Sequence, residues 1–345
     1  RDQLEQGSLV PPRGVRRRMT APPPGAAPAP ASAAQDEQQL SDQEIRERRA
    51  AAAAIYGERF QDRSARVQAR SPHGRRKGWA LRPVIVKSGD DCRQESLAMQ
   101  LITAFDTIFQ EERLPLWLRP YEVLVTSDRT ALIEFVPNTA SIHAIKSKSP
   151  PGSSLRDHYL ARFGPAGTPE WAVAQRSFVE SMAAYSLVSY LLQIKDRHNG
   201  NILVDEAGHL VHIDFGFMLS NSPGGVNFEA APFKLTRELL QVMDSDSDGR
   251  ASELFDYFKV LCIRGFLAAR KHADRLLLLV EMVENSGFPC FKAGPRTVPA
   301  LRRRFAPHLT EAQIVDHVLG LIGESLDSWR TRQYDIYQRL LNGIA

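Results

Sequence analysis

Residues 194–217 read Ile-Lys-Asp-Arg-His-Asn-Gly-Asn-Ile-Leu-Val-Asp-Glu-Ala-Gly-His-Leu-Val-His-Ile-Asp-Phe-Gly-Phe, and this stretch decides the fold. Two short segments, Ile202–Val204 and His209–Ile213, consist mainly of β-branched and aliphatic residues. Between them, residues 205–208 end in a glycine, which tolerates the positive φ that a tight turn needs. The stretch therefore predicts a β-hairpin that holds the loops at its two ends close together.

Asp196, Asn201 and Asp214 lie on the loops that this hairpin joins. Carboxylate and carboxamide oxygens are hard ligands, so we expect Asn201 and Asp214 to bind Mg²⁺ together with phosphate oxygens. Asp196 precedes Asn201 by the offset that separates the catalytic Asp from the metal-binding Asn in the protein-kinase loop H-R-D-x-x-x-x-N. Asp-Phe-Gly at 214–216 matches the second metal-binding element of those enzymes. Together the two motifs indicate phosphoryl transfer.

The detailed sequence of these motifs resembles the phosphoinositide 3-/4-kinase superfamily more than ordinary protein kinases. Asp-Arg-His-Asn at 196–199 replaces His-Arg-Asp, and His-Ile-Asp-Phe-Gly-Phe follows at 212–217. Gly-Asp-Asp-Cys-Arg-Gln-Glu at 89–95 resembles the Gly-Asp-Asp-x-Arg-Gln-Asp/Glu element of the lipid kinases. The resemblance implies an α+β, bilobal, protein-kinase-like fold with a small β-rich N-lobe and a larger, mostly helical C-lobe.

A lysine and a glutamate upstream of the hairpin are candidate nucleotide ligands. An apolar strand expected at Pro83–Lys87 ends in the lysine, and Glu95 lies near the start of a helix expected to run to Glu111. The buried stripe of this helix comprises Leu97, Leu101, Phe105 and Ile108. A lysine on a strand and a glutamate on the packed helix form the ion pair that directs the ammonium group toward ATP phosphates. The alternative is a solvated lysine at a strand end.

Residues 71–79 form a turn-rich loop before this strand, where a kinase N-lobe has its phosphate-covering loop. Ser71 and Gly74 are its candidate nucleotide contacts. The only glycines of the loop are Gly74 and Gly78, so it is not a clean glycine motif, and a plain turn is the alternative.

Two further apolar strands are expected at Pro115–Val125 and Thr130–Pro137, and a proline ends the second one. The second strand is the expected hinge between the lobes. The family resemblance implies adenine contacts from the backbone near Glu134 and Val136 and from the side chains of Tyr121 and Ile85. Core packing is the alternative role of these apolar side chains.

The rest of the chain is expected to be helical, with long helices at 172–193, 252–284 and 311–341. We therefore expect three parts. Residues 1–70 are a low-complexity, disordered flank with one or two exposed helices, residues 71–139 the N-lobe and hinge, and residues 140–345 the C-lobe with the catalytic and activation loops.

The net charge of +4 is unevenly distributed. Residues 1–82 carry 16 Arg and Lys against 9 Asp and Glu, whereas residues 83–345 carry 28 against 31. A basic flank is attracted to anionic membranes or nucleic acid, but solvated disorder is the commoner explanation and no nucleic-acid motif is present. The chain begins at Arg1 without a Met, which indicates a fragment of a longer protein.

The composition, 43% hydrophobic and 24% charged, is that of a globular protein. The longest aliphatic run, Leu276–Val280, falls far short of the roughly 18 to 20 residues that span a bilayer, so any membrane association is expected to be peripheral. Cys92, Cys262 and Cys290 are widely spaced and match no zinc or disulfide pattern, which favours a reducing cytosol.

The segment from Asp214 to Lys234, the expected activation loop, contains no Arg or Lys before Lys234. An acceptor that already carried ring phosphates would need several cationic donors, so unphosphorylated phosphatidylinositol fits better. The apolar residues of this loop suit either contact with lipid or packing beneath the loop. They are Phe217, Met218, Leu219 and Phe228.

From about residue 71 to the C-terminus the chain resembles the type III beta phosphatidylinositol 4-kinases, most of all those of plants and algae. Gly-Phe-Met-Leu-Ser-Asn-Ser-Pro-Gly-Gly-Val-Asn-Phe-Glu at 216–229 and Trp-Arg-Thr-Arg-Gln-Tyr-Asp at 329–335 carry this resemblance, as does Pro-Phe-Lys-Leu-Thr-Arg-Glu at 232–238. The stretch after Gly74 is more basic than in that family, and the helical domain upstream is absent. The resemblance implies a cytoplasmic enzyme on Golgi- or endosome-type membranes, with small GTPases or adaptor proteins as partners.

The expected reaction moves the γ-phosphate of ATP to the 4-hydroxyl of phosphatidylinositol, with Mg²⁺, or Mn²⁺ in its place, as the metal. Lys87 would bind the α- and β-phosphates, and Glu95 would orient Lys87. Either Asp196 or His198 would receive the hydroxyl proton, and the sequence leaves both open. The alternatives are a Ser/Thr protein kinase of the PI3-kinase-related family and a catalytically silent scaffold with the kinase fold.

Overall fold

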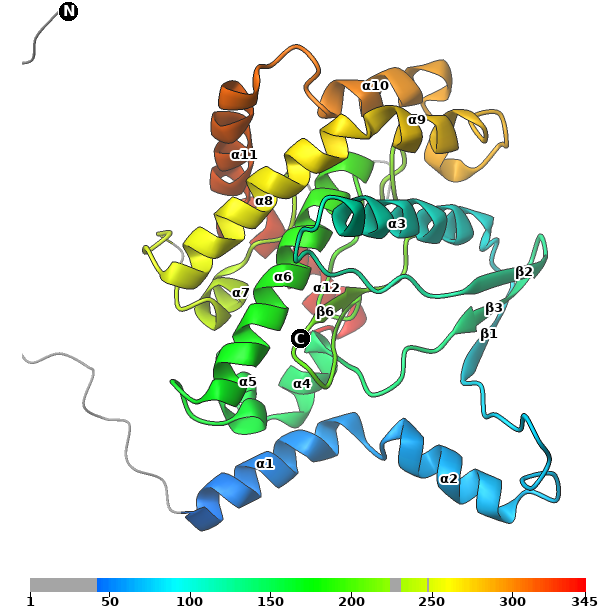
Figure 1. Ribbon diagram of the computed structural model, residues 1–345, viewed down its shortest axis with the longest axis vertical. Helices are drawn as coiled ribbons and strands as arrows, with labels where there is room; N and C mark the ends of the chain where they lie inside the picture. The colour runs from blue at the N-terminus through cyan, green and yellow to red at the C-terminus, as the bar shows by residue number, and fades with distance from the viewer. Residues whose placement is uncertain (1–41, 224–230, 247) are drawn as a thin grey trace, which may run out of the picture. The chain divides into compact units, whose positions relative to one another are not determined.

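The computed structural model describes residues 42–223, 231–246 and 248–345. The Pro- and Ala-rich flank before residue 42, for which disorder is expected, and Phe228 of the activation loop lie outside the described residues. The described part is an α+β structure with two small antiparallel sheets and many helices, which confirms the expected fold class (Figure 1).

The first sheet contains β1 (Val84–Ser88), β2 (Val123–Ser127) and β3 (Thr130–Glu134) in the order β1-β3-β2. Its register places Lys87 opposite Ala131 on the central strand. The helix α3 (Arg93–Glu111) packs against β2 and follows β1 directly. All four residues of its expected apolar stripe are buried, because they share one face of the helix. The strand–helix pair that carries Lys87 and Glu95 is thereby confirmed.

The strand expected at Pro115–Val125 was wrong in its first part, because only Val123–Ser127 pairs with β3. Two prolines in residues 115–122 cannot donate the backbone hydrogen bonds of a ladder. This segment packs against the C-lobe instead. Trp117 stacks on His209 with ring centroids 4.0 Å apart, and its backbone N–H donates to Glu180 of a C-lobe helix at 3.4 Å.

The second sheet contains β4 (Ala140–Ser141), β5 (Ile202–Val204) and β6 (Leu210–His212), and the last two form the expected hairpin. Gly208 closes the turn with φ of 90°, and a Cβ there would lie 3.0 Å from the carbonyl oxygen of Ala174. The hydroxyl of Tyr159 donates to the Gly208 carbonyl at 2.7 Å. Only glycine fits this position, so the hairpin is anchored tightly to the helices beneath it.

The central helix of the C-lobe is α6 (Pro169–Leu192), which starts at the N-cap Thr168 and delivers the chain to the catalytic loop. It ends where Gln193 adopts the left-handed conformation with φ of 51°. Helix α8 (Glu253–Lys271) packs closely on it, because a Cβ at Gly265 would lie 2.5 Å from the side chain of Leu187. The expected helix at 172–193 is confirmed.

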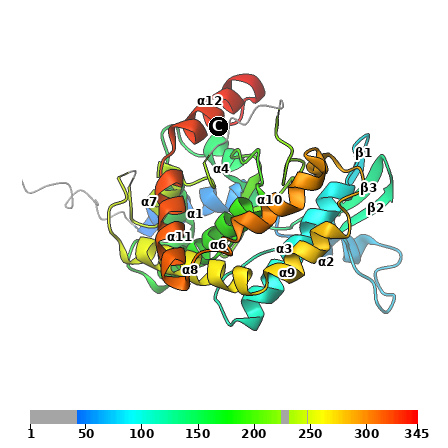
Figure 2. The same ribbon diagram turned by 90° about the horizontal axis from the view of Figure 1, so that it is seen from above.

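The remaining helices surround this pair, and the stretches expected at 252–284 and 311–341 are each divided in two. They are α4 (Ile142–Lys148), α5 (Leu155–Phe163), α7 (Arg237–Val242), α9 (Ala273–Glu281), α10 (Thr297–Arg304), α11 (Glu311–Ser325) and α12 (Trp329–Asn342), with 3₁₀ turns at Pro289–Phe291 and Gly294–Arg296. Seen from above, α12 lies at the margin of the C-lobe, near α4 (Figure 2). The backbone N–H of Ala345 donates to the His143 side chain at the start of α4 at 2.8 Å.

The described part of the flank contains α1 (Asp42–Tyr56) and α2 (Phe60–Arg70). Helix α2 buries no residue, as expected for an exposed helix, but α1 packs on α5 and buries Ala52 and Ile55. The hydroxyl of Tyr56 lies 3.1 Å from His158 of α5. Burial lowers the pKa of His158 to about 4, so this histidine is neutral at neutral pH.

No helix in the described part of the chain is long and apolar enough to cross a membrane. The three cysteines, all described, are free and buried. Burial raises the pKa of Cys290 to about 12, which keeps this thiol protonated and unreactive.

Candidate active site

The hairpin brings the catalytic loop and the Asp-Phe-Gly segment together through backbone hydrogen bonds, as the sequence predicts. The N–H of Ile213 donates to the Asn201 carbonyl at 3.1 Å, and the N–H of Lys195 donates to the Phe217 carbonyl at 3.0 Å. Asp196 and Asp214 both have positive φ, 66° and 59°, a strained conformation for residues other than glycine. Such strain is concentrated at functional sites, which supports this loop pair as the active site.

Arg197 binds the two loops together, a role that the sequence pattern did not reveal. Its buried guanidinium group donates to the carbonyls of Lys195 at 3.1 Å, Ile213 at 2.7 Å and Asp214. The same group lies over the Phe215 ring, 5.3 Å from its centroid. One cation therefore fixes the relative positions of the expected catalytic loop and the Asp-Phe-Gly segment.

Helix α12 contacts the proposed base Asp196, although the two lie far apart in the sequence. The Tyr334 hydroxyl donates to Oδ1 of Asp196, and the Gln338 amide donates to the same oxygen at 3.3 Å. Lys234, which is buried, bridges Asn199 of the catalytic loop at 3.0 Å and Asp335 of α12 at 2.6 Å. The C-terminal helix thus holds the catalytic loop at two points.

The side chains of Asn201 and Asp214 fit a magnesium site that is completed by a nucleotide. The amide nitrogen of Asn201 donates to the Asp196 carbonyl at 3.0 Å, which turns the side-chain oxygen away from that bond. Asp214 is exposed, and its Oδ1 accepts from the Gly216 N–H at 3.3 Å. In the described residues no group of three or more His, Cys, Asp or Glu could hold a metal by itself. Mg²⁺ commonly takes one or two protein oxygens and fills the remaining positions with phosphate oxygens and water.

His198 is the second candidate for the proton. Burial lowers its pKa, as do the nearby charges of Arg197 and Lys234, while Asp196 opposes the change. The imidazole is therefore neutral at pH 7. Its Nδ1 accepts from the Gly200 N–H at 3.1 Å, and its Nε2 faces Oδ1 of Asp196 at 3.9 Å. A Cβ at Gly200 would lie 2.9 Å from this ring, so glycine permits the close approach.

Lys87 and Glu95 lie on the same side of the N-lobe, but they do not form the expected close ion pair. Within 4 Å, the carboxylate that Lys87 meets is Asp90 at 3.8 Å, and Glu95 accepts a hydrogen bond from the Tyr121 hydroxyl at 2.6 Å. Burial acts to lower the pKa of Lys87, yet the charges of Glu95 and Asp214 outweigh it and raise the pKa. The lysine is therefore charged, and Asp214 is one of the acidic residues that favour its charged form.

The substitution Glu95→Gln is expected to remove the part of the pH dependence of folding stability that comes from Glu95. Burial raises the pKa of Glu95, against the opposing effects of Tyr121 and Lys87. The folded state thus retains a proton that the unfolded state has released, so stability falls as pH rises above the ordinary glutamate range. Glutamine does not titrate, so Glu95→Gln removes this loss of stability. In urea titrations, the unfolding free energy of Glu95→Gln minus that of the unmodified chain should increase from pH 4 to pH 8. A difference that is constant with pH would contradict the burial of a charged Glu95.

The candidate adenine residues differ in exposure. Tyr121 and Val136 are buried, whereas Ile85 is 47% exposed on β1. The backbone N–H of Glu134 donates to the Glu122 carbonyl at 2.8 Å, and the Val136 carbonyl accepts from the Thr139 hydroxyl at 2.9 Å. The Glu134 N–H and the Val136 carbonyl, both on the expected hinge, thus already have hydrogen-bond partners within the chain.

The loop at residues 71–79 is attached to the end of α2. The N–H of Ser71 donates to the Val67 carbonyl at 2.9 Å, and the Gln68 side chain donates to the Gly74 carbonyl at 3.0 Å. A Cβ at Gly74 would lie 2.0 Å from the Gln68 carbonyl oxygen. Packing on α2 is therefore sufficient reason for glycine at this position.

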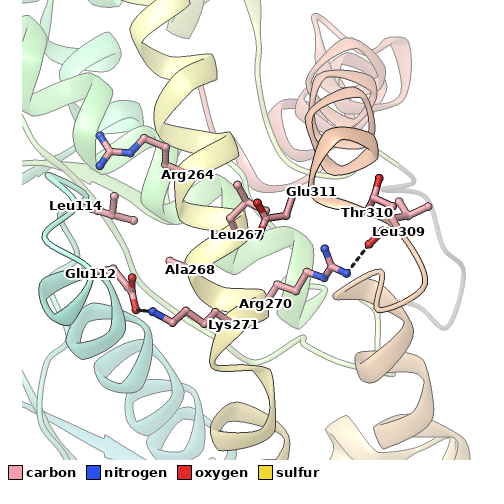
Figure 3. Close-up of a pocket in the computed structure, with 10 residues that line it drawn as sticks. All are labelled: Glu112, Leu114, Arg264, Leu267, Ala268, Arg270, Lys271, Leu309, Thr310 and Glu311. Atoms are coloured by element: carbon pink, nitrogen blue, oxygen red, sulfur yellow. Dashed lines mark hydrogen bonds and ion pairs between the residues drawn. The ribbon is translucent and has the colours of Figure 1, made fainter. Parts of the chain in front are cut away.

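A cavity of about 720 Å³ lies where the end of α3 meets α8 and the start of α11 (Figure 3). Figure 3 shows Arg270 donating to the Leu309 carbonyl and Lys271 paired with Glu112 at 2.8 Å across it. None of the residues predicted to act in catalysis lines this cavity. The cavity is therefore separate from the candidate active site.

Most of the chain is similar in sequence to known proteins. Residues 82–293 match the family model described as phosphatidylinositol 3- and 4-kinase. Phosphatidylinositol 4-kinase beta 1 of Arabidopsis thaliana is 67% identical over 291 residues, which are 84% of this chain and 26% of that protein. Phosphatidylinositol 4-kinase of Dictyostelium discoideum is 49% identical over 290 residues, 84% of this chain and 24% of that protein. Phosphatidylinositol 4-kinase beta of Xenopus tropicalis is 45% identical over 293 residues, 85% of this chain and 36% of that protein. The chain thus spans about a quarter to a third of the length of these relatives.

Proposed function

Because the chain belongs to the phosphatidylinositol 3- and 4-kinase family, we propose that it transfers the γ-phosphate of ATP to the 4-hydroxyl of phosphatidylinositol. The observation that carries this proposal is the convergence of Asp196, Asn201 and Asp214 on two loops held together by Arg197. The relatives named above, which are phosphatidylinositol 4-kinases by their printed names, support the choice of lipid and ring position.

In this proposal the protein acts mainly by positioning and by charge. Lys87 would contact the α- and β-phosphates, and Asn201 and Asp214 would bind Mg²⁺, with Mn²⁺ as the alternative ion. A metal held there would supply positive charge against the charge that develops on the transferred phosphoryl group. The effect of the Asp214 charge on the pKa of Lys87 is consistent with this arrangement, because it means that the two side chains face the same region. Ile85, Tyr121, Glu134 and Val136 remain the proposed adenine contacts, and Ser71 and Gly74 the proposed phosphate-loop contacts.

We assign the base to Asp196 rather than to His198. The neutral imidazole of His198 has its Nδ1 lone pair engaged by the Gly200 N–H, and the proton on Nε2 then faces Asp196. This tautomer offers no lone pair to an incoming hydroxyl. The hydroxyl proton would pass to the Asp196 carboxylate as its oxygen bonds to the γ-phosphorus and the bond to the β–γ bridging oxygen breaks.

The activation segment supports an acceptor without ring phosphates. Lys234, its first cation, is buried and bonded to Asn199 and Asp335, so it serves the C-lobe rather than a substrate phosphate. Met218 and Leu219 are buried and Phe217 is partly buried, which favours packing beneath the loop over lipid contact for the first two.

We propose peripheral attachment to Golgi- or endosome-type membranes, with small GTPases or adaptors as recruiting partners.

The test is a transfer assay in which γ-labelled ATP, phosphatidylinositol vesicles and peptides containing serine and threonine are present together. Label on the lipid alone, with chromatography of the deacylated product placing the phosphate at the 4-position, is expected. Label on peptide alone would support the protein-kinase alternative, and no transfer at saturating ATP and Mg²⁺ would support the scaffold alternative.

A further inference from the structure

Gln94, the second residue of α3, is buried and fully hydrogen-bonded, yet neither the nucleotide nor the metal is expected to touch it. Only 6% of the residue is exposed. Its amide nitrogen donates to the carbonyls of Phe215 at 3.0 Å and Gly216 at 2.7 Å, and its amide oxygen accepts from the Cys290 N–H at 2.9 Å. All three bonds are to backbone, so both amide protons and the oxygen are used to fix distant parts of the chain.

The segment that contains Cys290 is itself tied to the activation segment. The Ser220 hydroxyl donates to the Cys290 carbonyl at 2.6 Å and accepts from the Ala293 N–H at 3.0 Å. Beside Gln94, the Arg93 guanidinium lies over the Phe288 ring, 5.5 Å from its centroid. The turn at Pro289–Phe291 therefore joins the start of α3 to the residues that follow Asp-Phe-Gly.

Two side chains together bind every carbonyl group of the Asp-Phe-Gly segment. Arg197 of the catalytic loop donates to the carbonyls of Ile213 and Asp214, and Gln94 donates to those of Phe215 and Gly216. Asp214 has φ of 59°, so its side-chain direction depends on backbone that is held on both sides. Loss of either side chain would release the backbone on one side of Asp214, and the direction of the Asp214 carboxylate would then no longer be fixed.

We propose that Gln94 is a positioning residue for the metal ligand Asp214, a role that rests on the proposed function. The adjacent Glu95 is bonded to Tyr121 and shares its field with Lys87. Gln94 and Glu95 are consecutive residues of α3. Gln94 thus lies near the proposed metal ligand Asp214, and Glu95 near the proposed phosphate ligand Lys87. Of these two residues, Gln94 is the one bonded to the segment that carries Asp214, so its loss is expected to affect the metal site and not Lys87.

The test compares Gln94→Met with Gln175→Met. Gln175 on α6 is a matched control, because it is 4% exposed and its amide nitrogen also makes two bonds, to the Val242 carbonyl at 2.8 Å and to Asp244 at 2.9 Å. Binding of a fluorescent ATP analogue is titrated with MgCl₂. For Gln94→Met the Mg²⁺ concentration at half-maximal binding should rise about tenfold, as the loss of two or three ordinary hydrogen bonds implies. Affinity without Mg²⁺ should be unchanged.

Gln175→Met should lose comparable thermal stability but keep the Mg²⁺ requirement of the unmodified chain. The proposal would be overturned if both variants needed the same Mg²⁺ concentration, or if Gln94→Met needed no more than the unmodified chain. Gln94 would then have a structural role only. Amide hydrogen exchange supplies a readout that does not depend on function. The Cys290 N–H should exchange faster in Gln94→Met and not in Gln175→Met. Unchanged exchange of Cys290 in Gln94→Met would also overturn the proposal. Failure of the unmodified chain to phosphorylate phosphatidylinositol would contradict the proposed function while leaving both readouts decisive for Gln94.

Discussion

Substituting Asp214 by alanine is expected to reduce phosphoryl transfer to phosphatidylinositol vesicles by at least about a thousandfold. Asp214 is exposed, and the charge of its carboxylate helps to raise the pKa of Lys87. Its removal would take away a proposed metal ligand and, with the metal, the main counter-charge of the β- and γ-phosphates. Transfer of label from γ-labelled ATP at saturating Mg²⁺ measures the effect.

The fold should survive this substitution, because the Asp214 carboxylate accepts a single local bond from Gly216. Thermal unfolding of Asp214→Ala is therefore expected to match that of the unmodified chain. Asp128→Ala is the control, since Asp128 is an exposed aspartate at the turn between β2 and β3 and should leave activity unchanged. Retained activity in Asp214→Ala would remove this residue from the metal site.

Substituting Arg197 by methionine is expected to impair both stability and catalysis. The carbonyl of Lys195, in a buried bond, and those of Ile213 and Asp214, in part-buried bonds, would lose a charged donor. Leaving a buried acceptor unsatisfied costs roughly 1 to 3 kcal/mol, and less where water can reach it. We expect unfolding free energy to fall by about 3 kcal/mol and activity per folded molecule to fall by about a hundredfold, because the two loops would separate. Urea denaturation and label transfer measure the two effects.

Arg197→Lys should recover little of either property, because one ammonium group cannot reproduce the planar fork that contacts three carbonyls. Arg264→Met, at an exposed position on α8, is the control and should change stability by no more than about 0.5 kcal/mol. Stability within that range for Arg197→Met would show that the buried bonds of Arg197 do not hold the loops together.

Short-range features were predictable because each depends on residues close in the sequence. The hairpin at 202–213 follows from two β-branched segments around a glycine turn, and α3 follows from apolar residues at helical spacing. Asp196, Asn201 and Asp214 were placed together because a hairpin must bring its own ends together. The strand prediction failed at residues 115–122, because the two prolines there cannot donate the backbone hydrogen bonds of a sheet.

The sequence by itself determined the fold class and the order of the motifs, and it supplied the candidate residues for binding a metal and a nucleotide. Only the tertiary structure decided that Arg197 and Gln94 hold the Asp-Phe-Gly segment, that α12 reaches Asp196, and that Lys87 approaches Asp90 more closely than Glu95. The physical reason is that most of these contacts join a side chain to a backbone carbonyl or to a residue far along the chain. Every residue carries a carbonyl, so no pattern of residue types marks which one a distant arginine or glutamine will bind.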